Sequence, residues 1–254
     1  MLLKFILGNN GDPTGDEYTR GMYKRILLKL SGEQLQGQFD GGFDADRAAW
    51  IAEEIKKAQG AEIIIMIGGG NYARGAQLAG KGVQRVTADN IGMMATIMNA
   101  VALTDVFNSN GLTARALTNL TLDQVADQFT HRRALSHLSK GRVVIVAGGI
   151  GRPYLTTDTA AVSLALELEC DAILKATKVD GIYDSDPAQN PNAQKITTIS
   201  HQQALEQPDI KIMDKAALGL ATEHDQALVV FELLKPDNIA KAIAGESIGT
   251  TIKS

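Results

Sequence analysis

The residues best suited to chemistry are glycines and cationic side chains that directly follow apolar, strand-like runs. Lys29 ends the first run and is followed by Ser31-Gly32, whereas Gly68–Gly70 follow the second run, with Arg74 close behind. Backbone N–H groups exposed by glycine, together with a lysine ammonium or an arginine guanidinium, bind phosphate oxygens. This pattern predicts a phosphate-binding site built from loops.

Two loops in the second half of the chain carry similar groups. Residues 148–158 read GGIGRPYLTTD and place two threonine hydroxyls ahead of a helix that we expect to start at Asp158. Helix N-termini favour anions. Residues 175–187 read KATKVDGIYDSDP and place Lys175 and Lys178 on both sides of a strand end, where they can neutralise charge on a moving phosphoryl group. Each loop alone also fits an ordinary cap or turn, so the combination carries the argument.

The P-loop sequence G-x-x-x-x-G-K-[ST] does not occur in the chain, so a phosphate site must come from the other loops. No protein metal ligand is expected either. The four histidines, at positions 131, 137, 201 and 224, show no ligand spacing and lie in polar stretches that we expect to be exposed.

Composition restricts the class of protein. The 254 residues are 44% apolar and 21% charged, an ordinary globular balance. A net charge of −4 and only 5% aromatic residues argue against a nucleic-acid surface. The single cysteine, Cys170, excludes an internal disulfide and fits a reducing cytoplasm, and its apolar surroundings predict burial at a helix end. No apolar run reaches the ~18 residues of a membrane helix.

Short β-favouring runs alternate with helical patterns, which is typical of a mostly parallel sheet covered by helices on both faces. We expect strands at 26–30, 63–67, 143–147, 172–175, 227–232 and 250–252. We expect helices at 45–59 (capped by Asp44), 89–104, 159–169, 215–223 and 238–244. Residues 1–21 turn from a short apolar patch into polar sequence, and we interpret them as a disordered leader or an artificial extension.

Six segments, in this order, resemble the uridylate kinases of the amino acid kinase family. They are residues 23–32 (YKRILLKLSG), 68–75 (GGGNYARG), 85–96 (RVTADNIGMMAT), 156–161 (TTDTAA), 175–187 (KATKVDGIYDSDP) and 213–214 (MD). The likeness covers essentially residue 22 to the C-terminus. It implies one α/β domain at 22–254, a three-layer αβα sandwich around a mostly parallel sheet. Residues 22–170 then form an acceptor-binding half and 171–254 an ATP-binding half.

The resemblance implies transfer of the ATP γ-phosphate to UMP in pyrimidine nucleotide biosynthesis, with Mg²⁺ carried by ATP. Lys29, Arg74 and Asp214 are the implied catalytic residues, Asp214 by orienting the active-site lysines. The implied ATP-binding residues are Lys29, Leu30, Ser31, Gly32, Gly70, Arg74, Thr177, Tyr183 and Asp186. The implied UMP-binding residues are Gly69, Asp89, Ile150, Gly151, Arg152, Pro153, Tyr154, Leu155, Thr156 and Thr157.

Two departures from the family pattern concern ligands. Ile150 and Arg152 stand where typical members have the threonine and asparagine on the uracil side, which bears on base recognition. Thr104 and Asn108 replace an arginine and a histidine of an activating GTP site between subunits, which puts GTP activation in doubt. The resemblance further implies a homohexamer and feedback inhibition by UTP, which would occupy the acceptor pocket. Met93, Met94, Ile97 and Met98 fit either a subunit interface or a buried core helix.

Two alternatives remain open. One is an enzyme of the same fold that acts on a different nucleoside monophosphate or on a small acid, such as a carboxylate or carbamate. Ile150 and Arg152 support it, whereas Asp89 and the KATKVDG segment speak against a small acid. The other is a regulatory nucleotide-binding module without catalysis, in which Lys29 or Arg74 is expected to be lost, and both are present.

Overall fold

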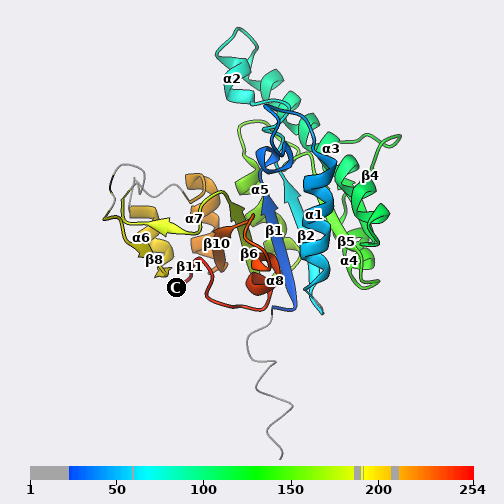
Figure 1. Ribbon diagram of the computed structural model, residues 1–254. Helices are drawn as coiled ribbons and strands as arrows, with labels where there is room; N and C mark the ends of the chain where they lie inside the picture. Colours follow the sequence, from blue (N-terminus) through cyan, green and yellow to red (C-terminus); the bar gives the residue numbers. More distant parts are fainter. Residues whose placement is uncertain (1–22, 59, 186–189, 191, 207–211) are drawn as a thin grey trace, which may run out of the picture.

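A computed structural model of the chain describes residues 23–254, apart from 59, 186–189, 191 and 207–211 (Figure 1). The leader expected at 1–21 and the ATP-binding residue expected at Asp186 lie outside the described residues.

A nine-stranded sheet forms the centre of the molecule, in the order β4-β3-β5-β2-β1-β6-β10-β11-β9. All neighbouring strands are parallel except β10 and β11, which are antiparallel. The strands are β1 (Arg25–Leu30), β2 (Glu62–Ile67), β3 (Ala114–Thr118), β4 (Asp127–Gln128), β5 (Val143–Ala147), β6 (Ala172–Thr177), β9 (Thr198–Ile199), β10 (Leu228–Glu232) and β11 (Thr250–Ile252). A separate antiparallel pair joins β7 (Ile182–Tyr183) to β8 (Lys195–Ile196).

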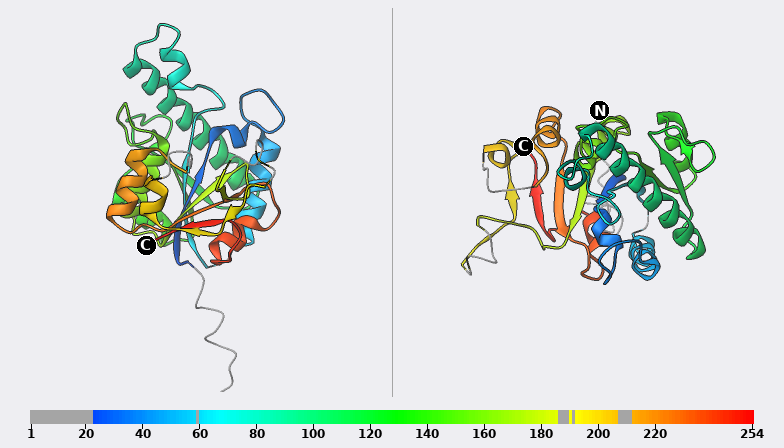
Figure 2. Two further views of the ribbon diagram at one scale, coloured as in Figure 1. Left: turned by 90° about the vertical axis from the view of Figure 1, so that its left-hand side faces the viewer. Right: turned by 90° about the horizontal axis from the view of Figure 1, so that it is seen from above.

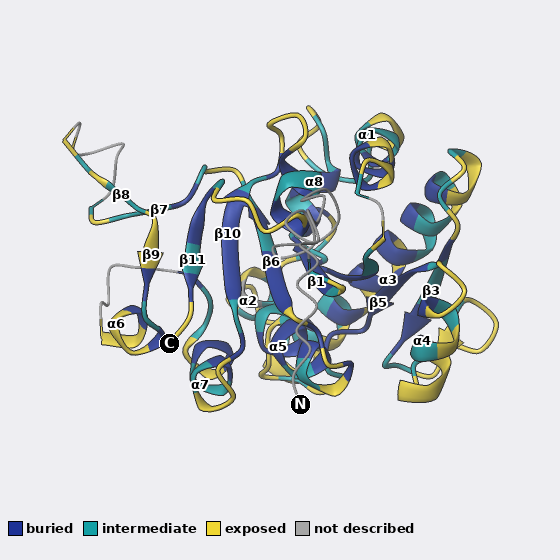
Figure 3. Cartoon of the chain, turned by 90° about the horizontal axis from the view of Figure 1, so that it is seen from below, coloured by how far each residue is buried: buried dark blue, intermediate teal, exposed yellow. Residues whose placement is uncertain are grey.

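Helices cover both faces of this sheet, as the left view of Figure 2 shows. The central strands between them are buried (Figure 3). One face packs against α1 (Ala45–Lys56), α3 (Arg85–Ser109) and α8 (Asn238–Ile243). The other packs against α4 (His131–Leu138), α5 (Thr157–Glu167), α6 (His201–Glu206) and α7 (Lys215–Glu223). The expected three-layer αβα sandwich is therefore confirmed.

Alternation along the strands decides which side chains meet which helices. In β1, Leu28 joins the core under α1 and α3, whereas Leu27 joins the core under α5 and α7. Successive side chains of a strand point to opposite faces, so Lys29 lies on the same face as Leu27. This face carries α5, whose first turn becomes important below.

Several expected elements agree with the structure at both ends, including the strand at 143–147 and the helix at 215–223. Asp44 caps α1, because its carboxylate accepts hydrogen bonds from the backbone N–H groups of Asp46 and Arg47. The helix expected at 89–104 is longer and spans Arg85–Ser109. Strand β3 and helix α4 are among the elements that were not predicted, because neither contains a long apolar run.

Helix α3 is also apolar on most sides. Its mean hydropathy over 18 residues is 1.3, so by length and composition alone it could cross a membrane, although no unbroken apolar run in the sequence reaches the ~18 residues of a membrane helix. The core helices of soluble proteins pass the same test, and 44% of that window is buried in the protein. Together with α2 (Gly75–Ala79), its first turns project beyond the edge of the sheet where β1 ends (Figure 1).

Two single-residue predictions have opposite outcomes. Cys170 is buried as predicted, just after α5, and burial raises the pKa of its thiol to about 12. The prediction that all four histidines are exposed is wrong for His201, which is only 1% exposed, and His137 is only partly exposed. The His201 Nε2 donates to the backbone oxygen of Gln226 at 2.9 Å, so the ring helps to close the core beside β9.

Candidate active site

The four loops singled out in the sequence lie side by side. Strands β5, β2, β1 and β6 are consecutive and parallel, so their carboxyl ends share one edge of the sheet. The loops that follow them begin at Gly148, Gly68, Ser31 and Lys178. Ligands of open α/β sheets bind at this edge, so the fold brings the predicted phosphate-binding loops to one cleft.

The loops after β1 and β2 are in direct backbone contact. A Cβ atom on Gly32 would lie 2.7 Å from the Gly70 nitrogen and 2.8 Å from the Gly68 oxygen. No side chain fits at such distances, so glycine is required here for close approach rather than for an unusual φ. Gly32 also begins a short 3₁₀ helix, η1 (Gly32–Leu35), which carries Glu33 towards the mouth of the cleft.

Two lysines meet at the base of the cleft. Lys29 in β1 and Lys175 in β6 are register partners on adjacent strands, with their side chains on the α5 face. The carboxylate of Asp158 lies between them. Its Oδ1 is 2.7 Å from the Lys29 Nζ and its Oδ2 is 2.9 Å from the Lys175 Nζ. We call these three residues the buried cation cluster; it carries one net positive charge.

Nearby charges keep Asp158 ionised within the buried cation cluster. Burial alone would raise the pKa of Asp158, but the nearby charges of Lys29 and Lys175 hold that pKa below its ordinary value. Burial lowers the pKa of Lys175, and the attraction of Asp158 opposes this effect. Lys175 also donates to the backbone oxygen of Ile212. The excess positive charge is therefore available to an anion that enters the cleft.

Asp158 has a different local role from the one predicted. The helix was expected to start at Asp158, but the cap is Thr156, whose hydroxyl accepts from the backbone N–H groups of Asp158 and Thr159. Helix α5 thus begins at Thr157, and Asp158 lies in its first turn. This position points the carboxylate at the two lysines instead of at its own helix end.

Asp158 forms the direct ion pairs with the two lysines, and the expected role of Asp214 in orienting them stays a prediction. Asp214 caps α7 by accepting from the Ala217 N–H at 2.9 Å. Its carboxylate also accepts hydrogen bonds from the hydroxyls of Thr156 and Thr159. Among the described residues, Asp214 forms no ion pair with Lys29 or Lys175. It therefore joins α7 to the start of α5, and its negative charge also opposes the lowering of the Lys175 pKa by burial.

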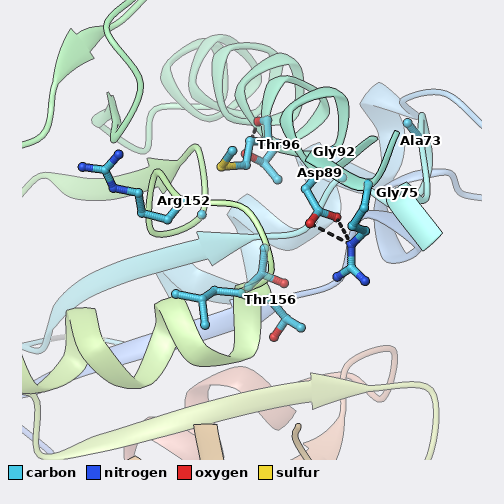
Figure 4. Close-up of a pocket in the computed structure, with 13 residues that line it drawn as sticks. Ala73, Gly75, Asp89, Gly92, Thr96, Arg152 and Thr156 are labelled. Atoms are coloured by element: carbon cyan, nitrogen blue, oxygen red, sulfur yellow. Dashed lines mark hydrogen bonds and ion pairs between the residues drawn. The ribbon is translucent and has the colours of Figure 1, made fainter. Parts of the chain in front are cut away.

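A cavity of about 250 Å³ opens beside the cluster, between α3 and the loop after β5 (Figure 4). Six predicted UMP-binding residues line it: Gly69, Asp89, Arg152, Leu155, Thr156 and Thr157. Its other lining residues were not predicted to bind UMP; they are Ala73, Gly75, Arg85, Gly92, Met93, Thr96 and Gly149. Most of these come from α3, whose spacing of small residues was an available but unspecific signal.

Asp89 is the acidic group of this cavity. Both of its carboxylate oxygens accept from Arg85 Nε, at 2.9 and 2.8 Å (Figure 4). Its Oδ2 also accepts from the Tyr154 backbone N–H at 2.8 Å. Tyr154 has a φ of 69°, a rare value for a residue other than glycine. The Arg85 guanidinium lies 5.1 Å from the Tyr154 ring centre, so Arg85 and Asp89 together hold the loop against α3.

Four predicted UMP-binding residues do not line this cavity: Ile150, Gly151, Pro153 and Tyr154. Ile150 instead lines a neighbouring cavity of about 300 Å³ with Asn119, Phe129 and residues of α5. The backbone of Gly151 has a φ of 74° and packs close to Asn119. Of Ile150 and Arg152, the two positions in this loop that depart from the family pattern, only Arg152 lines the cavity of about 250 Å³. Its guanidinium points away from Asp89 and Thr156 (Figure 4).

A second group of cations lies at the rim of the cleft. Arg74 and Lys178 both face Glu33 of η1; Arg74 hydrogen-bonds one carboxylate oxygen, and the Lys178 Nζ is 4.0 Å from the other. We call these three residues the rim cluster. It joins the loops that follow β1, β2 and β6. Sequence analysis identified both cations but overlooked Glu33.

The residues expected around the ATP base and sugar follow β6. The Thr177 hydroxyl hydrogen-bonds the backbone oxygens of Val179 and Phe231, at 2.6 and 3.2 Å. The Tyr183 hydroxyl donates to Asp180 at 2.8 Å. These bonds shape the loop between β6 and β7, while the binding roles of both residues stay predictions. Leu30 is fully buried, so only its backbone can face a ligand.

No group of three or more histidine, cysteine, aspartate or glutamate side chains is placed to hold a metal ion within the described part of the chain. The carboxylate at the base of the cleft, Asp158, already contacts two ammonium groups. These residues fit an Mg²⁺ ion that arrives with nucleotide phosphates and keeps waters, rather than one held in a dedicated cage.

Comparison with known proteins identifies the family. The amino acid kinase family matches residues 24–232. A UMP kinase from Bacillus anthracis is 38% identical, with a TM-score of 0.87 over 91% of this chain and 96% of its own. One from Ureaplasma parvum is 35% identical, with a TM-score of 0.85 over 91% and 99%. The uridylate kinase of Archaeoglobus fulgidus is 27% identical, with a TM-score of 0.67 over 89% and 99%. The chain belongs to the amino acid kinase family.

Proposed function

We propose that this protein transfers the γ-phosphate of ATP to UMP and forms UDP and ADP. One observation carries the proposal: two buried lysines share a single carboxylate at the junction of four glycine-rich or cationic loops, directly beside an acceptor-sized cavity. The similarity to UMP kinases supports the identity of the acceptor. We also propose the division of labour expected from the sequence, with residues 22–170 binding UMP and 171–254 binding ATP.

Phosphoryl transfer needs positioning and charge neutralisation more than covalent chemistry. The UMP phosphate is the nucleophile and is ionised at neutral pH, so no side chain has to remove a proton. Lys29 and Lys175 lie where they can neutralise charge on the transferred group, and Asp158 keeps both ammonium groups at one point. Backbone N–H groups of the Gly68–Gly70 loop complete the cradle.

Arg74 binds the phosphate that enters from the acceptor side. In the structure its guanidinium hydrogen-bonds Glu33, and half of its side chain is exposed to solvent. An exposed pair of this kind is weak, so a phosphate dianion can replace the carboxylate. Mg²⁺ bound to ATP would shield its phosphate oxygens from the incoming anion.

Asp89 accepts hydrogen bonds from the ribose hydroxyls of UMP. Its carboxylate already accepts from Arg85 and from the Tyr154 N–H, and two carboxylate oxygens offer about four acceptor positions. Free acceptor positions therefore remain for the sugar. The base lies towards Met93 and Arg152 at the other end of the cavity. Arg152 can donate to the carbonyl groups of uracil after its side chain rotates inward.

The test is ADP release from Mg·ATP with UMP, CMP, dCMP, dTMP and GMP offered separately. We expect strong preference for UMP. Turnover with another acceptor would contradict the assignment of UMP but not of the reaction. Absence of turnover with every acceptor would contradict the reaction itself and favour a regulatory nucleotide-binding module.

A second candidate is a same-fold kinase with a different nucleoside monophosphate or a small acid as acceptor. The observation that favours it is the acceptor cavity itself, which Arg152 lines and Ile150 does not. The variant Arg152→Asn restores the residue type expected from the family pattern. A shift of preference towards UMP in this variant would support the second candidate.

We further propose a cytoplasmic homohexamer that UTP inhibits by occupying the acceptor cavity. Met94 and Met98 are about half exposed on α3, whereas Met93 and Ile97 are buried, so this helix presents an apolar outer face to a partner. The positions of Thr104 and Asn108 argue against GTP activation. Light scattering of the full chain and rates with added UTP or GTP test these points. A monomer, or insensitivity to UTP, would contradict them.

A further inference from the structure

Helix α3 carries two fully buried polar side chains, although most of its surface is apolar. Thr96 is 2% exposed and Asn99 is not exposed at all. They are three residues apart, so they lie on the same face of the helix. Buried polar groups destabilise a fold unless they are hydrogen-bonded, so their partners reveal what they do.

Thr96 connects α3 to the loop after β5. Its hydroxyl oxygen accepts a hydrogen bond from the Gly148 backbone N–H at 2.7 Å and donates to the Met93 oxygen at 2.7 Å. Gly148 has a φ of 82°, so the chain turns sharply there, and the next residues lead into the acceptor cavity. The Gly148 N–H is the first backbone N–H group after strand β5.

Asn99 connects the same helix to the loop after β2. Its Nδ2 donates to the Gly68 backbone oxygen at 2.7 Å and to Asn71 Oδ1 at 2.7 Å. Asn71 donates back to Asn99 Oδ1 at 2.9 Å and also to the Gly42 oxygen at 2.7 Å. The two amides thus enclose both ends of the Gly68–Gly70 segment.

In the middle of this segment, the backbone of Gly69 touches α3 directly. A Cβ atom on Gly69 would lie 2.7 Å from the Ala95 Cβ and 3.0 Å from the Thr96 nitrogen. The Gly68–Gly70 segment is therefore held at its ends by amides and pressed against the helix in its middle. Helix α3 therefore positions both the Gly68–Gly70 segment and the loop that begins at Gly148.

We propose that Thr96 and Asn99 are positioning residues that set the separation of the two glycine loops, and with it the alignment of acceptor and donor. This inference rests on the proposed function and deepens it. Neither side chain needs to touch the reacting atoms. A displacement of about 1 Å in such a scaffold costs roughly 100-fold in rate, so these hydrogen bonds matter more for turnover than for folding.

The first experiment compares steady-state kinetics of Thr96→Val with the wild-type chain. Valine keeps the shape of threonine but leaves the Gly148 N–H without its partner. We expect the KM for UMP to rise about tenfold, with the KM for Mg·ATP unchanged within a factor of two, because the freed loop borders the acceptor cavity. Thr96→Ser keeps the hydroxyl and should restore the wild-type KM for UMP.

The matched control is Thr222→Val in α7. Its hydroxyl also bonds a backbone oxygen, that of Leu218 at 2.7 Å, but within its own helix and away from the loops. We expect this variant to keep the wild-type kinetic constants. Equal kinetic losses in Thr96→Val and Thr222→Val would overturn the proposal, since they would reflect general destabilisation.

Asn99→Leu tests the second loop. Leucine has a similar volume but cannot hold the Gly68 oxygen or the Asn71 amide. We expect kcat to fall about 100-fold, because the Gly68–Gly70 segment lies between both substrates. Wild-type kcat in a folded Asn99→Leu protein would overturn its role. If this variant does not fold, the Thr96 series decides the proposal alone.

Amide exchange of Gly148 gives a readout that does not depend on activity. In the wild-type chain and in Thr96→Ser this N–H should be protected, whereas in Thr96→Val its exchange should accelerate at least about tenfold. Unchanged exchange in Thr96→Val would contradict the positioning role even if the wild-type chain proved inactive with UMP. Failure of the wild-type chain to phosphorylate UMP, with the exchange result intact, would instead contradict the proposed function.

Discussion

The buried cation cluster and the rim cluster have the same composition, two cations around one carboxylate, in very different surroundings. Side chains of the buried cluster, Lys29, Asp158 and Lys175, are 10–16% exposed. Those of the rim cluster, Arg74, Glu33 and Lys178, are 32–66% exposed. The buried cations stand on adjacent sheet strands, whereas the rim cations stand on loops.

This difference separates two tasks that a kinase has to perform on anions. Charges out of water interact strongly and cannot separate without a large desolvation cost, so the buried cluster is fixed before any substrate arrives. Exposed pairs contribute little and exchange partners readily. The buried cluster is therefore suited to stabilising a transient charge, and the rim cluster to capturing and releasing a phosphate.

The largest effect is expected from Asp158→Asn, which leaves two buried ammonium groups facing each other. We expect the free energy of unfolding to drop by about 3 kcal/mol and turnover by at least about 100-fold. Urea denaturation and ADP release measure the two quantities. Glu62→Gln is the control, since it breaks a less buried pair with Arg25 in the same sheet and should cost below about 1 kcal/mol.

Protonation of Asp158 at low pH should reduce the stability of the wild-type chain in the same way as the Asp158→Asn substitution. The pKa of Asp158 is lower in the folded protein than in the unfolded chain, so its ion pairs stabilise the fold above the unfolded value of about 3.9. This stability is lost as the pH falls through the lower folded pKa. The stability difference between the wild-type chain and Asp158→Asn should therefore be constant near neutrality and shrink below about pH 3.9. A difference that shrinks already between pH 7 and 5 would contradict this ionisation.

An intermediate effect is expected from Arg74→Met, which removes the cation at the rim. The KM for UMP should rise about 30-fold, the factor for one charge-assisted hydrogen bond of about 2 kcal/mol. Stability should change by less than about 0.5 kcal/mol, because the pair with Glu33 is exposed. A stability loss as large as that of Asp158→Asn would remove the distinction between the two clusters.

The smallest effect is expected from Glu33→Gln, which releases Arg74 and Lys178 from their carboxylate. The KM for UMP should fall about two- to threefold in low salt, because the phosphate no longer competes with Glu33. The gain should disappear at about 1 M salt, where exposed charges are screened. If the KM for UMP rises instead, Glu33 orients Arg74 for binding and does not compete with the substrate.

Sequence patterns located the loops of this site but not the contacts across it. Gly68–Gly70 and Gly148 were recognisable because each follows an unbroken apolar run that becomes a buried strand. The pairing of Lys29 with Lys175 depends on strand register between segments far apart in the chain, which no local pattern encodes. The local sequence around Asp158 resembles a helix cap. Only the position of α5 over the sheet, which the local sequence does not encode either, directs its carboxylate to the lysines.

Other differences have similar causes. His201 lies in a polar stretch, yet β9 and α6 turn it into the core, since burial depends on tertiary packing rather than on neighbours in sequence. Helix α3 was recognised but its polar residues were not, because threonine and asparagine within an apolar helix have no distinctive spacing. Their importance emerges only when Gly68 and Gly148 are placed beside them.

The contact of Gly32 with the Gly68 oxygen and the Gly70 nitrogen leaves no room for even one methyl group. Two surfaces in such contact cannot slide past each other without a collision. The turns after β1 and β2 therefore move as a single mechanical part, which α3 anchors through Gly69. A movement of one of these turns against the other would therefore have to break the contact at Gly32 first.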